Sequence, residues 1–439
     1  MVRTTSFFRI LKLNVILCCL FFLGSSLKAQ QYVAIPDSGF VAWLNNSGFS
    51  GAMRNDSLDI LSQTVLNTHY LNTSYQHIAS LEGVEYFINL DSLKCNSDTT
   101  LTYIPALPQN LKVLECRNDS LVSLPALPAS LLRLVCEFNV LDSLPQLPAT
   151  LQSITCYNNK LTTLPTLPVT LNALYCSGNK IDSLPALSDS LTILSCYSNK
   201  LSKLPALPAL LVNLLCSGNV LTTIPTLPSL LKTLSCYNNK LTALPALPDS
   251  LQAINCGYNK LTTLPALPNS LSLVNAQYNS LTSLPALPDS LFQFFIDNNP
   301  TLQCLPLLNT IVDFEFFNTS IACWPNIGNV LISNPDTLNI CDATNNTHGC
   351  LQISGVKETG KPVIALYPNP AKNFFNLIIE QSTVGGTVRI IDNTGKQVSY
   401  SKLQSANVQI ATTGLSAGSY IVLINDPQGR TAVSKLVIQ

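Results

Sequence analysis

The stretch "LTTLPTLPVTLNALYCSGNK", residues 161–180, indicates the architecture of the chain, because nearly the same string returns again and again at a constant spacing. From Leu101 to Pro300 the chain aligns in ten consecutive blocks of equal length, with the pattern LxxLPxLPxxLxxLxCxxNx and no insertion. A repeat this short predicts a solenoid, because one block cannot bury its apolar side without neighbours.

Each block contains one short strand. Block positions are numbered 1 to 20 from the first leucine, and positions 13 to 17 alternate in character, as in Ala173, Leu174, Tyr175, Cys176 and Ser177. A period of two residues is typical of a strand, so the stacked blocks predict one long parallel sheet on the concave face. Proline at positions 5 and 8 fixes φ and removes two backbone donors. The convex return segment should therefore be extended or polyproline-like.

Position 16 holds a column of cysteines. Ala276 and Ile296 replace cysteine in later blocks, which indicates a site for a small apolar group, and free cysteine is among the most buried residue types. We therefore expect reduced thiols that pack the core. Disulfides between repeats and a metal site are the alternatives, but parallel side chains suit a disulfide poorly and a linear column cannot surround zinc. The column comprises Cys116, Cys136, Cys156, Cys176, Cys196, Cys216, Cys236 and Cys256, with Cys95 expected ahead of it.

Position 19 holds a second column, formed by asparagine. It runs from Asn139 to Asn299 with one asparagine in every block, and Asp119 takes this position in the first block. Buried polar groups need partners, so each amide is expected to bind backbone groups of adjacent turns.

The doubled Leu-Pro pattern resembles the bacterial type of leucine-rich repeat, which implies a leucine-rich-repeat solenoid. Before the repeats, "IPDSGFVAWLNNSGF", residues 35–49, offers Asp37 or Ser38 as a helix cap ahead of Phe40, Val41 and Leu44. This segment resembles the amino-terminal cap of bacteroidete leucine-rich-repeat proteins. The cap should be partly helical.

Four cysteines follow the regular repeats. Cys304 and Cys323 each lie two residues before a proline on successive turns, and Cys341 and Cys350 bracket a nine-residue step. In an oxidising compartment we expect the bridges Cys304–Cys323 and Cys341–Cys350. Free thiols in a degenerate repeat are the alternative.

The last part of the chain has a different character from residue 361 onward. Short alternating runs such as "TVRIIDNTGKQV", residues 387–398, predict a small all-β sandwich. The segment resembles the carboxyl-terminal sorting domain of type IX secretion substrates, which implies an export address read by the outer-membrane translocon. A fibronectin-like adhesion module is the alternative. The resemblance is carried by Tyr367, Pro368, Asn369, Pro370, Phe374, Asp392, Gly395, Leu415, Gly418, Tyr420, Lys435, Leu436 and Val437.

The amino-terminal end reads as a signal peptide: Arg3 and Arg9 precede the apolar run 15–23, and small residues follow up to Ala29. No later stretch approaches the roughly 20 apolar residues of a membrane span. The 24 basic residues equal the 24 acidic ones, so no strong field draws nucleic acid. With the sorting domain, this predicts a secreted or cell-surface protein, outside the outer membrane of a Gram-negative bacteroidete.

The sequence offers no catalytic constellation. His69, His77 and His348 lie in the predicted caps, and no P-loop, HExxH or GxSxG motif occurs. We therefore predict no enzymatic activity, no cofactor and no metal site.

The outward positions 13, 15, 17 and 18 carry aromatic residues among Ser, Asn and Gly, a composition typical of adaptable binding surfaces. Tyrosine also simply suits strands, which is the alternative. Charges gather at the two ends of the repeats: Glu115, Arg117, Arg133 and Glu137 early, and Asp297, Asp313 and Glu315 late. The predicted ligand-binding face comprises Phe138, Tyr157, Tyr175, Tyr197, Tyr237, Tyr258, Tyr278 and Phe295.

We therefore predict a non-catalytic leucine-rich-repeat protein that binds a macromolecule, protein or glycan, through its concave face. The alternative is a structural or glycan-binding envelope component without a dedicated protein ligand. The expected domains are a signal peptide (1–29), an amino-terminal cap (30–77), leucine-rich repeats (78–300), degenerate repeats with a carboxyl-terminal cap (301–350), a linker (351–360) and the sorting domain (361–439).

Overall fold

The computed structural model describes residues 31–306, 308, 311, 313–323, 325, 350, 364–367, 369–379, 383–392, 396–427 and 431–439. The predicted signal peptide and linker lie outside these residues. The chain divides into two compact units, residues 1–160 and 161–439. The boundary falls within the regular repeats. Among the described residues, no helix is long and apolar enough to cross a membrane.

The first unit begins with a mixed cap. A small antiparallel sheet of order β1-β3-β2 is accompanied by two α-helices and two 3-10 turns. The cap is therefore partly helical, as the sequence predicts. The bounds are β1 Tyr32–Ala34, α2 Ser38–Asn46, η1 Ser50–Ala52, β2 Met53–Arg54, β3 Ser57–Asp59, α3 Gln63–Leu66 and η2 Val84–Tyr86.

Asp37, one of the two predicted caps, is the residue that starts helix α2. One carboxylate oxygen accepts a hydrogen bond from the Phe40 backbone N–H at 2.7 Å. The other accepts from the backbone N–H groups of Ala79 at 2.9 Å and Ser80 at 3.0 Å. The helix buries Phe40 and Leu44 completely. Asp37 therefore caps the helix and also fastens it to the first turn of the solenoid.

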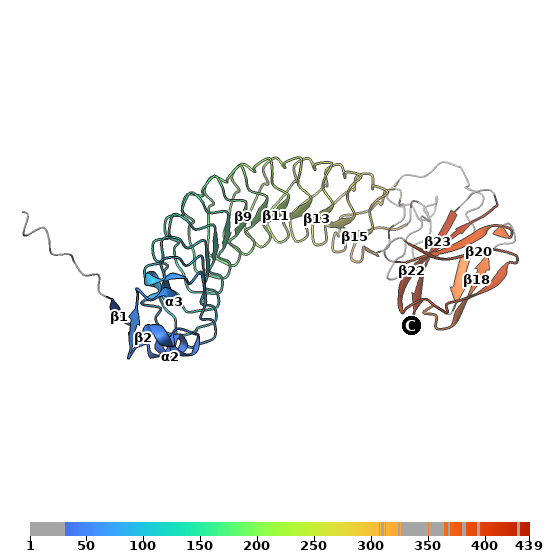
Figure 1. The fold of residues 1–439 in the computed structure, drawn as a ribbon. Helices are drawn as coiled ribbons and strands as arrows, with labels where there is room; N and C mark the ends of the chain where they lie inside the picture. The colour runs from blue at the N-terminus through green and yellow to red at the C-terminus, as the bar shows by residue number, and fades with distance from the viewer. Residues whose placement is uncertain are drawn as a thin grey trace, which may run out of the picture. The chain divides into compact units, whose positions relative to one another are not determined.

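The solenoid is a parallel sheet whose 13 strands follow one another in chain order from β4 to β16. Strands of neighbouring repeats pair without a shift, as Leu214 does with Leu234. Figure 1 shows β9, β11, β13 and β15 succeeding one another along the second unit. The bounds are β4 Tyr70–Asn72, β5 Ser92–Lys94, β6 Val113–Glu115, β7 Arg133–Val135, β8 Ser153–Thr155, β9 Ala173–Tyr175, β10 Ile193–Ser195, β11 Asn213–Leu215, β12 Thr233–Ser235, β13 Ala253–Asn255, β14 Leu273–Asn275, β15 Gln293–Phe295 and β16 Asp313–Glu315.

The core of each repeat is a set of stacked leucines and one cysteine. In the repeat of β12, Leu221, Leu231, Leu234 and Cys236 are all 0% exposed. The leucines at positions 4 and 7 are less completely covered, as Leu227 shows with 8% exposure. The side chains at positions 1, 11, 14 and 16 are thus the most completely buried.

The nine cysteines from Cys95 to Cys256 are buried thiols that form no disulfide, as the packing interpretation predicts. Burial raises the pKa of every one of these thiols for which a shift is resolved; that of Cys176 rises to about 12. Thiols at the two ends of the column donate weakly to the next repeat, as Cys95 does to the Glu115 carbonyl at 3.5 Å. A buried thiol with a raised pKa is neither accessible nor ionised, so it is chemically inert.

We expect these nine thiols to resist alkylation by iodoacetamide in the native protein at pH 8, because alkylation needs an exposed thiolate. All nine should react once the protein is unfolded in guanidinium. Intact-mass spectrometry before and after unfolding counts them. Native labelling of several column cysteines, or disulfides among them in the unfolded sample, would contradict the packing role.

The asparagine column binds the backbone as expected. The Asn239 side-chain oxygen accepts from the Leu221 N–H at 3.0 Å. Its amide nitrogen donates to the carbonyls of Cys216 at 3.1 Å, Cys236 at 3.0 Å and Tyr237 at 3.3 Å. One side chain therefore satisfies backbone groups of two adjacent turns.

The predicted disulfide pairing is wrong. Cys304 is bonded to Cys350, 46 residues away, so neither Cys304–Cys323 nor Cys341–Cys350 forms. Cys323 is itself disulfide-bonded, and Cys341 lies outside the described residues. Successive turns of a parallel stack direct their side chains alike, whereas a disulfide needs Cβ atoms that approach each other. Cys350 is not in a repeat and can meet Cys304 from another direction.

The carboxyl-terminal segment forms the predicted all-β sandwich, from two antiparallel sheets of order β17-β18-β21 and β20-β19-β22-β23. Phe375 and Leu377 on one sheet share a buried core with Val388, Val422 and Leu436 on the other. The bounds are β17 Ile364–Tyr367, β18 Phe374–Ile379, β19 Thr387–Ile391, β20 Gln397–Lys402, β21 Asn407–Ala411, β22 Gly418–Asn425 and β23 Thr431–Ile438.

Candidate binding face

Four positions of each repeat lie on the concave side of the sheet. Strand positions 13 and 15 flank a fully buried position 14, as Thr233 and Ser235 flank Leu234. The side chain at position 16, usually cysteine, points into the core again. The side chains at positions 17 and 18 follow the strand and lie on the concave side. The concave face is thus a grid with four side chains for each repeat.

Position 18 has a left-handed backbone. Glycine and asparagine adopt positive φ most readily, whereas a bulky side chain there is an outlier. Phe138 (φ 56°), Tyr258 (φ 53°) and Tyr278 (φ 52°) are such outliers. The other repeats place smaller residues at this point, namely Asn118, Asn158, Gly178, Ser198, Gly218, Asn238, Asn298 and Asn318. Three aromatic side chains therefore stand where the local backbone disfavours them.

Two of these outliers form a ring stack in the second unit. The ring centroids of Tyr258 and Tyr278 lie 4.0 Å apart with 28° between the planes, and Tyr237 joins at 4.9 Å from Tyr258. Tyr258 and Tyr278 remain 38% and 42% exposed. A side-chain hydrogen bond with Tyr278, together with burial, raises the pKa of Tyr258 to about 12. Tyr258, at the centre of this tyrosine stack of residues 237, 258 and 278, is therefore uncharged at any physiological pH.

The first unit carries a different surface, in which Phe138 and Tyr157 pack edge to face at 5.2 Å. Beside them lies a charged cluster of Lys94, Glu115, Arg117, Arg133 and Glu137. Glu115 contacts Lys94 at 3.4 Å and Arg133 at 3.6 Å, and Arg117 contacts Glu137 at 3.7 Å.

The two acids of this charged cluster are almost fully buried, while the arginines are about half exposed. Burial raises the pKa of Glu137, and Arg117 opposes that rise. One Glu137 oxygen is buried and has no hydrogen-bond partner. The first unit therefore offers both signs of charge on its concave side.

The far end of the repeats is acidic. Burial, Asp297 and Asp313 raise the pKa of Glu315, in that order of importance. Gln293 donates to Asp313 at 3.1 Å. No group of three or more His, Cys, Asp or Glu side chains could hold a metal ion in the part of the chain that the structure describes.

The structure thus places every predicted aromatic residue on the concave face but gathers only some of them. Phe138 contacts Tyr157, and Tyr237, Tyr258 and Tyr278 stack together, whereas Tyr175 and Phe295 are half-buried at strand ends. Tyr197 is 43% exposed. The sequence does not reveal the left-handed position, although asparagine or glycine in most repeats at position 18 is the signal that could have indicated it.

In the predicted sorting domain, Asn369 connects its motif to the final strand. The side-chain amide donates to the Lys435 carbonyl at 2.8 Å and accepts from the Val437 N–H at 2.8 Å. The Ala371 N–H donates to the Val437 carbonyl at 2.8 Å. Motifs that are far apart in sequence are therefore adjacent in the fold. Pro368 and Gly395 lie outside the described residues, as does the side chain of Tyr367.

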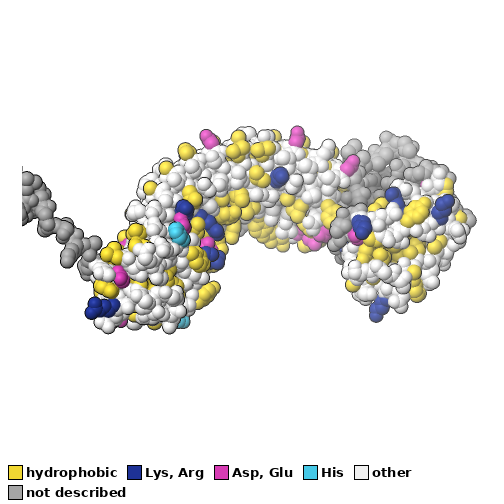
Figure 2. Space-filling model, in the orientation of Figure 1, with side chains coloured by type: hydrophobic (Ala, Val, Ile, Leu, Met, Phe, Trp, Pro, Cys, Tyr) yellow, Lys and Arg dark blue, Asp and Glu magenta, His cyan; other side chains and the backbone are white. Residues whose placement is uncertain are grey.

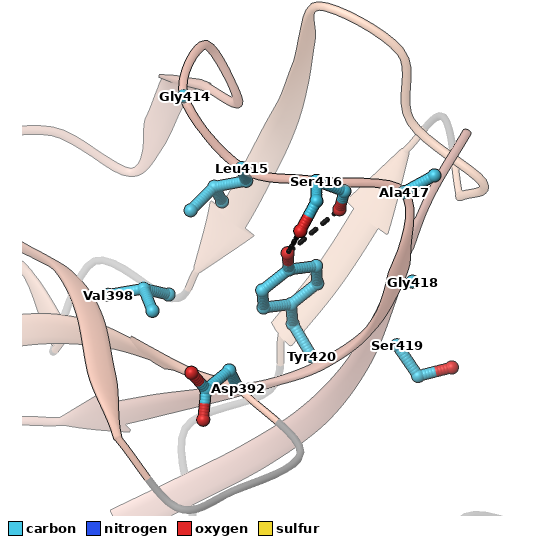
Figure 3. Close-up of a pocket in the computed structure, with 9 residues that line it drawn as sticks. All are labelled: Asp392, Val398, Gly414, Leu415, Ser416, Ala417, Gly418, Ser419 and Tyr420. Carbon is cyan, nitrogen blue, oxygen red and sulfur yellow. Dashed lines mark hydrogen bonds between the residues drawn. The ribbon is translucent and has the colours of Figure 1, made fainter.

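Four residues of the predicted sorting motifs, Asp392, Leu415, Gly418 and Tyr420, help to line a cavity of about 230 Å³ (Figure 3). The Tyr420 hydroxyl donates to the Ser416 carbonyl at 2.8 Å, which fixes the loop before β22. Figure 3 shows the Tyr420 ring directed at this loop, with Gly418 between them in the chain. The cavity is lined by Asp392, Val398, Gly414, Leu415, Ser416, Ala417, Gly418, Ser419 and Tyr420.

Comparison with known proteins agrees with both parts of the fold. Residues 365–439 match the model of the secretion system C-terminal sorting domain. No curated protein matches the chain.

Among solved structures, YopM from Yersinia enterocolitica is similar with 32% identity and a TM-score of 0.55, over 62% of this chain and 64% of that one. The chain therefore spans less than two thirds of YopM. A leucine-rich repeat protein from Bacteroides thetaiotaomicron aligns with 16% identity and a TM-score of 0.42, over 59% of this chain and 43% of that one. The functional domain of InlJ from Listeria monocytogenes, which includes a cysteine ladder, aligns with 16% identity and a TM-score of 0.37, over 94% of this chain and 100% of that one.

Proposed function

We propose that this secreted leucine-rich-repeat protein binds a macromolecular partner through its concave face and catalyses no reaction. The secretion machinery would be its first partner, through the sorting domain at residues 365–439. The cell surface or the medium of a Gram-negative bacteroidete would be its destination. The repeats would then act there as a recognition surface.

The observation that supports binding is the position of the aromatic outliers. A non-glycine residue with positive φ costs conformational energy, and such strain persists where function requires the side chain. Tyr258 and Tyr278 occupy this position in consecutive repeats and are exposed. Neither ring contributes to the core, so folding alone does not explain why tyrosine occupies this position. Contact of the rings with a binding partner would explain it.

The double variant Tyr258→Asn, Tyr278→Asn should lose binding and gain stability. Asparagine suits the left-handed backbone, so relief of strain at two residues should exceed the loss of one exposed ring stack and raise the Tm. Loss of central aromatic contacts should weaken binding by at least about tenfold. The measurement is binding of the full secreted protein to arrays of purified glycans and extracellular proteins, together with thermal unfolding.

The matched control is Leu210→Asn, Leu230→Asn, which also removes two exposed apolar side chains from consecutive repeats of the second unit. These leucines occupy position 10, away from the concave grid. The control should bind every partner of the wild type. Equal binding by the tyrosine variant and the control would refute a binding role for the tyrosine stack.

A further inference from the structure

The second unit presents a continuous uncharged strip on its concave side. In the six repeats of β9 to β14, all 24 grid positions (four in each of six repeats) lack Asp, Glu, Lys and Arg. The first charge on the grid after this strip is Asp297. Figure 2 shows few charged side chains over the middle repeats on the face in view. We call these 24 positions the neutral strip.

The side chains of the neutral strip are rings, amides and hydroxyls. Tyr175, Tyr197 and the tyrosine stack supply the rings. The side-chain amides of Asn213, Asn238 and Gln277 make no hydrogen bond to any other described residue, and all three are at least partly exposed. Each free amide offers donors and an acceptor to a ligand.

Some of the hydroxyls are already used within the protein. The Ser177 and Ser195 hydroxyl oxygens lie 2.9 Å apart, and those of Ser217 and Ser235 lie 2.8 Å apart, so in each pair one hydroxyl donates its proton to the other. The hydrogen-bonding capacity that remains therefore belongs mainly to the amides and the tyrosine hydroxyls.

These observations favour a neutral carbohydrate as ligand. A sugar ring has apolar C–H faces, which pack on the electron-rich face of an aromatic ring, and hydroxyl groups, which bind amides and hydroxyls. It carries no charge to be matched. A protein ligand would bring charges, and interfaces with proteins normally answer them with complementary charges that set specificity and association rate.

The first unit shows that the same fold can supply charges to its concave side. Lys94, Arg117 and Arg133 lie there with Glu115 and Glu137. The absence of charge from the grid positions of the six repeats of β9 to β14 is therefore a property of the neutral strip and not of the repeat fold.

The length of the neutral strip indicates a chain-like ligand. Neighbouring parallel strands are spaced by about 4.8 Å, so six strands extend over about 24 Å. This exceeds a single sugar. We propose that the neutral strip binds an uncharged polysaccharide, an inference that rests on the proposed binding function.

The test is isothermal titration of the full secreted protein with soluble polysaccharides. Dextran, galactomannan and mixed-linkage β-glucan are the neutral probes, and alginate and heparin are the anionic ones. We expect binding to at least one neutral probe, with the same affinity in low and high salt because no ion pair is involved. Tyr197→Ala and Asn213→Ala should each weaken it about tenfold or more, and Leu210→Asn should not.

Binding of none of the neutral probes would overturn the inference. So would binding that is confined to alginate or heparin and disappears at high salt. If only proteins on the arrays bind, and the tyrosine double variant loses them, the proposed function stands and the polysaccharide inference fails. If the double variant loses no partner of either kind, both fail.

Discussion

Asn239→Ala is expected to lower the free energy of unfolding by about 3 kcal/mol, because it orphans several buried backbone groups at once. The side chain is 9% exposed and binds one N–H and three carbonyls. Each buried group left without a partner costs about 1–3 kcal/mol, and relaxation or water recovers part of the sum. Chemical denaturation followed by circular dichroism measures the loss.

Amide hydrogen exchange should localise the Asn239→Ala effect. The repeats on either side of Asn239 should lose protection first, since each repeat of a solenoid depends on its neighbours. Lys240→Ala, at the exposed neighbouring position, is the control and should stay within about 0.5 kcal/mol of wild type. Equal stability of the two variants would mean that the asparagine column is not a principal stabiliser.

Asp119→Asn is expected to stabilise the protein by about 2 kcal/mol at pH 8 and by much less at pH 4. Asp119 occupies position 19 of the first block. At the same position of the next block, the Asn139 amide donates to the carbonyls of Cys116 and Cys136. One Asp119 oxygen accepts from the Asp98 N–H at 2.6 Å, but the other is buried without a partner. Asparagine would supply a donor there and remove a buried charge.

The pH dependence follows from the pKa of Asp119. Burial, and to a lesser degree the charge of Asp98, raise it from 3.8 to about 7. The folded state then holds the proton more tightly than the unfolded state. This contribution to stability is full below about pH 3.8 and is lost as pH rises toward 7. The shift corresponds to about 4 kcal/mol, which we halve because the carboxyl is partly accessible to solvent.

Urea denaturation of wild type and Asp119→Asn at pH 4 and pH 8 measures the difference. Asp182→Asn is the control, since Asp182 is exposed and its substitution should change stability little at either pH. Asp98, whose pKa burial also raises, should leave some pH dependence in the Asp119→Asn variant. An identical stability change at both pH values would show that Asp119 is already ionised, or already paired, throughout this range.

The repeat itself made much of this fold predictable. A constant block length fixes which residues face inward, so Cys236 and Asn239 could be assigned to columns without coordinates. Asp37 could be proposed as a cap because its side chain precedes an apolar helical pattern.

The features that sequence did not yield depend on three-dimensional geometry. The Cys304–Cys350 bond joins a repeat to a residue outside the repeats, and no periodicity specifies such a pair. The left-handed backbone at Tyr258 and Tyr278 could not be predicted, because most repeats signal it by asparagine or glycine at position 18 and these two repeats have tyrosine there. The raised pKa of Asp119 comes mainly from burial between adjacent turns, where one carboxylate oxygen also lacks a partner, and only the arrangement of those turns reveals it.

The uninterrupted block spacing also bears on how a gene for such a protein can change. Removal of residues 221–240 would join Val220 to Leu241 and leave every cysteine and asparagine in phase. Removal of half a block would place the cysteine and asparagine positions of one turn beside the return segment of the next turn. Unequal recombination between neighbouring coding repeats therefore alters the reach of the binding face in whole-turn steps and spares the fold at each step, so the length of this surface can evolve separately from the chemistry of its side chains.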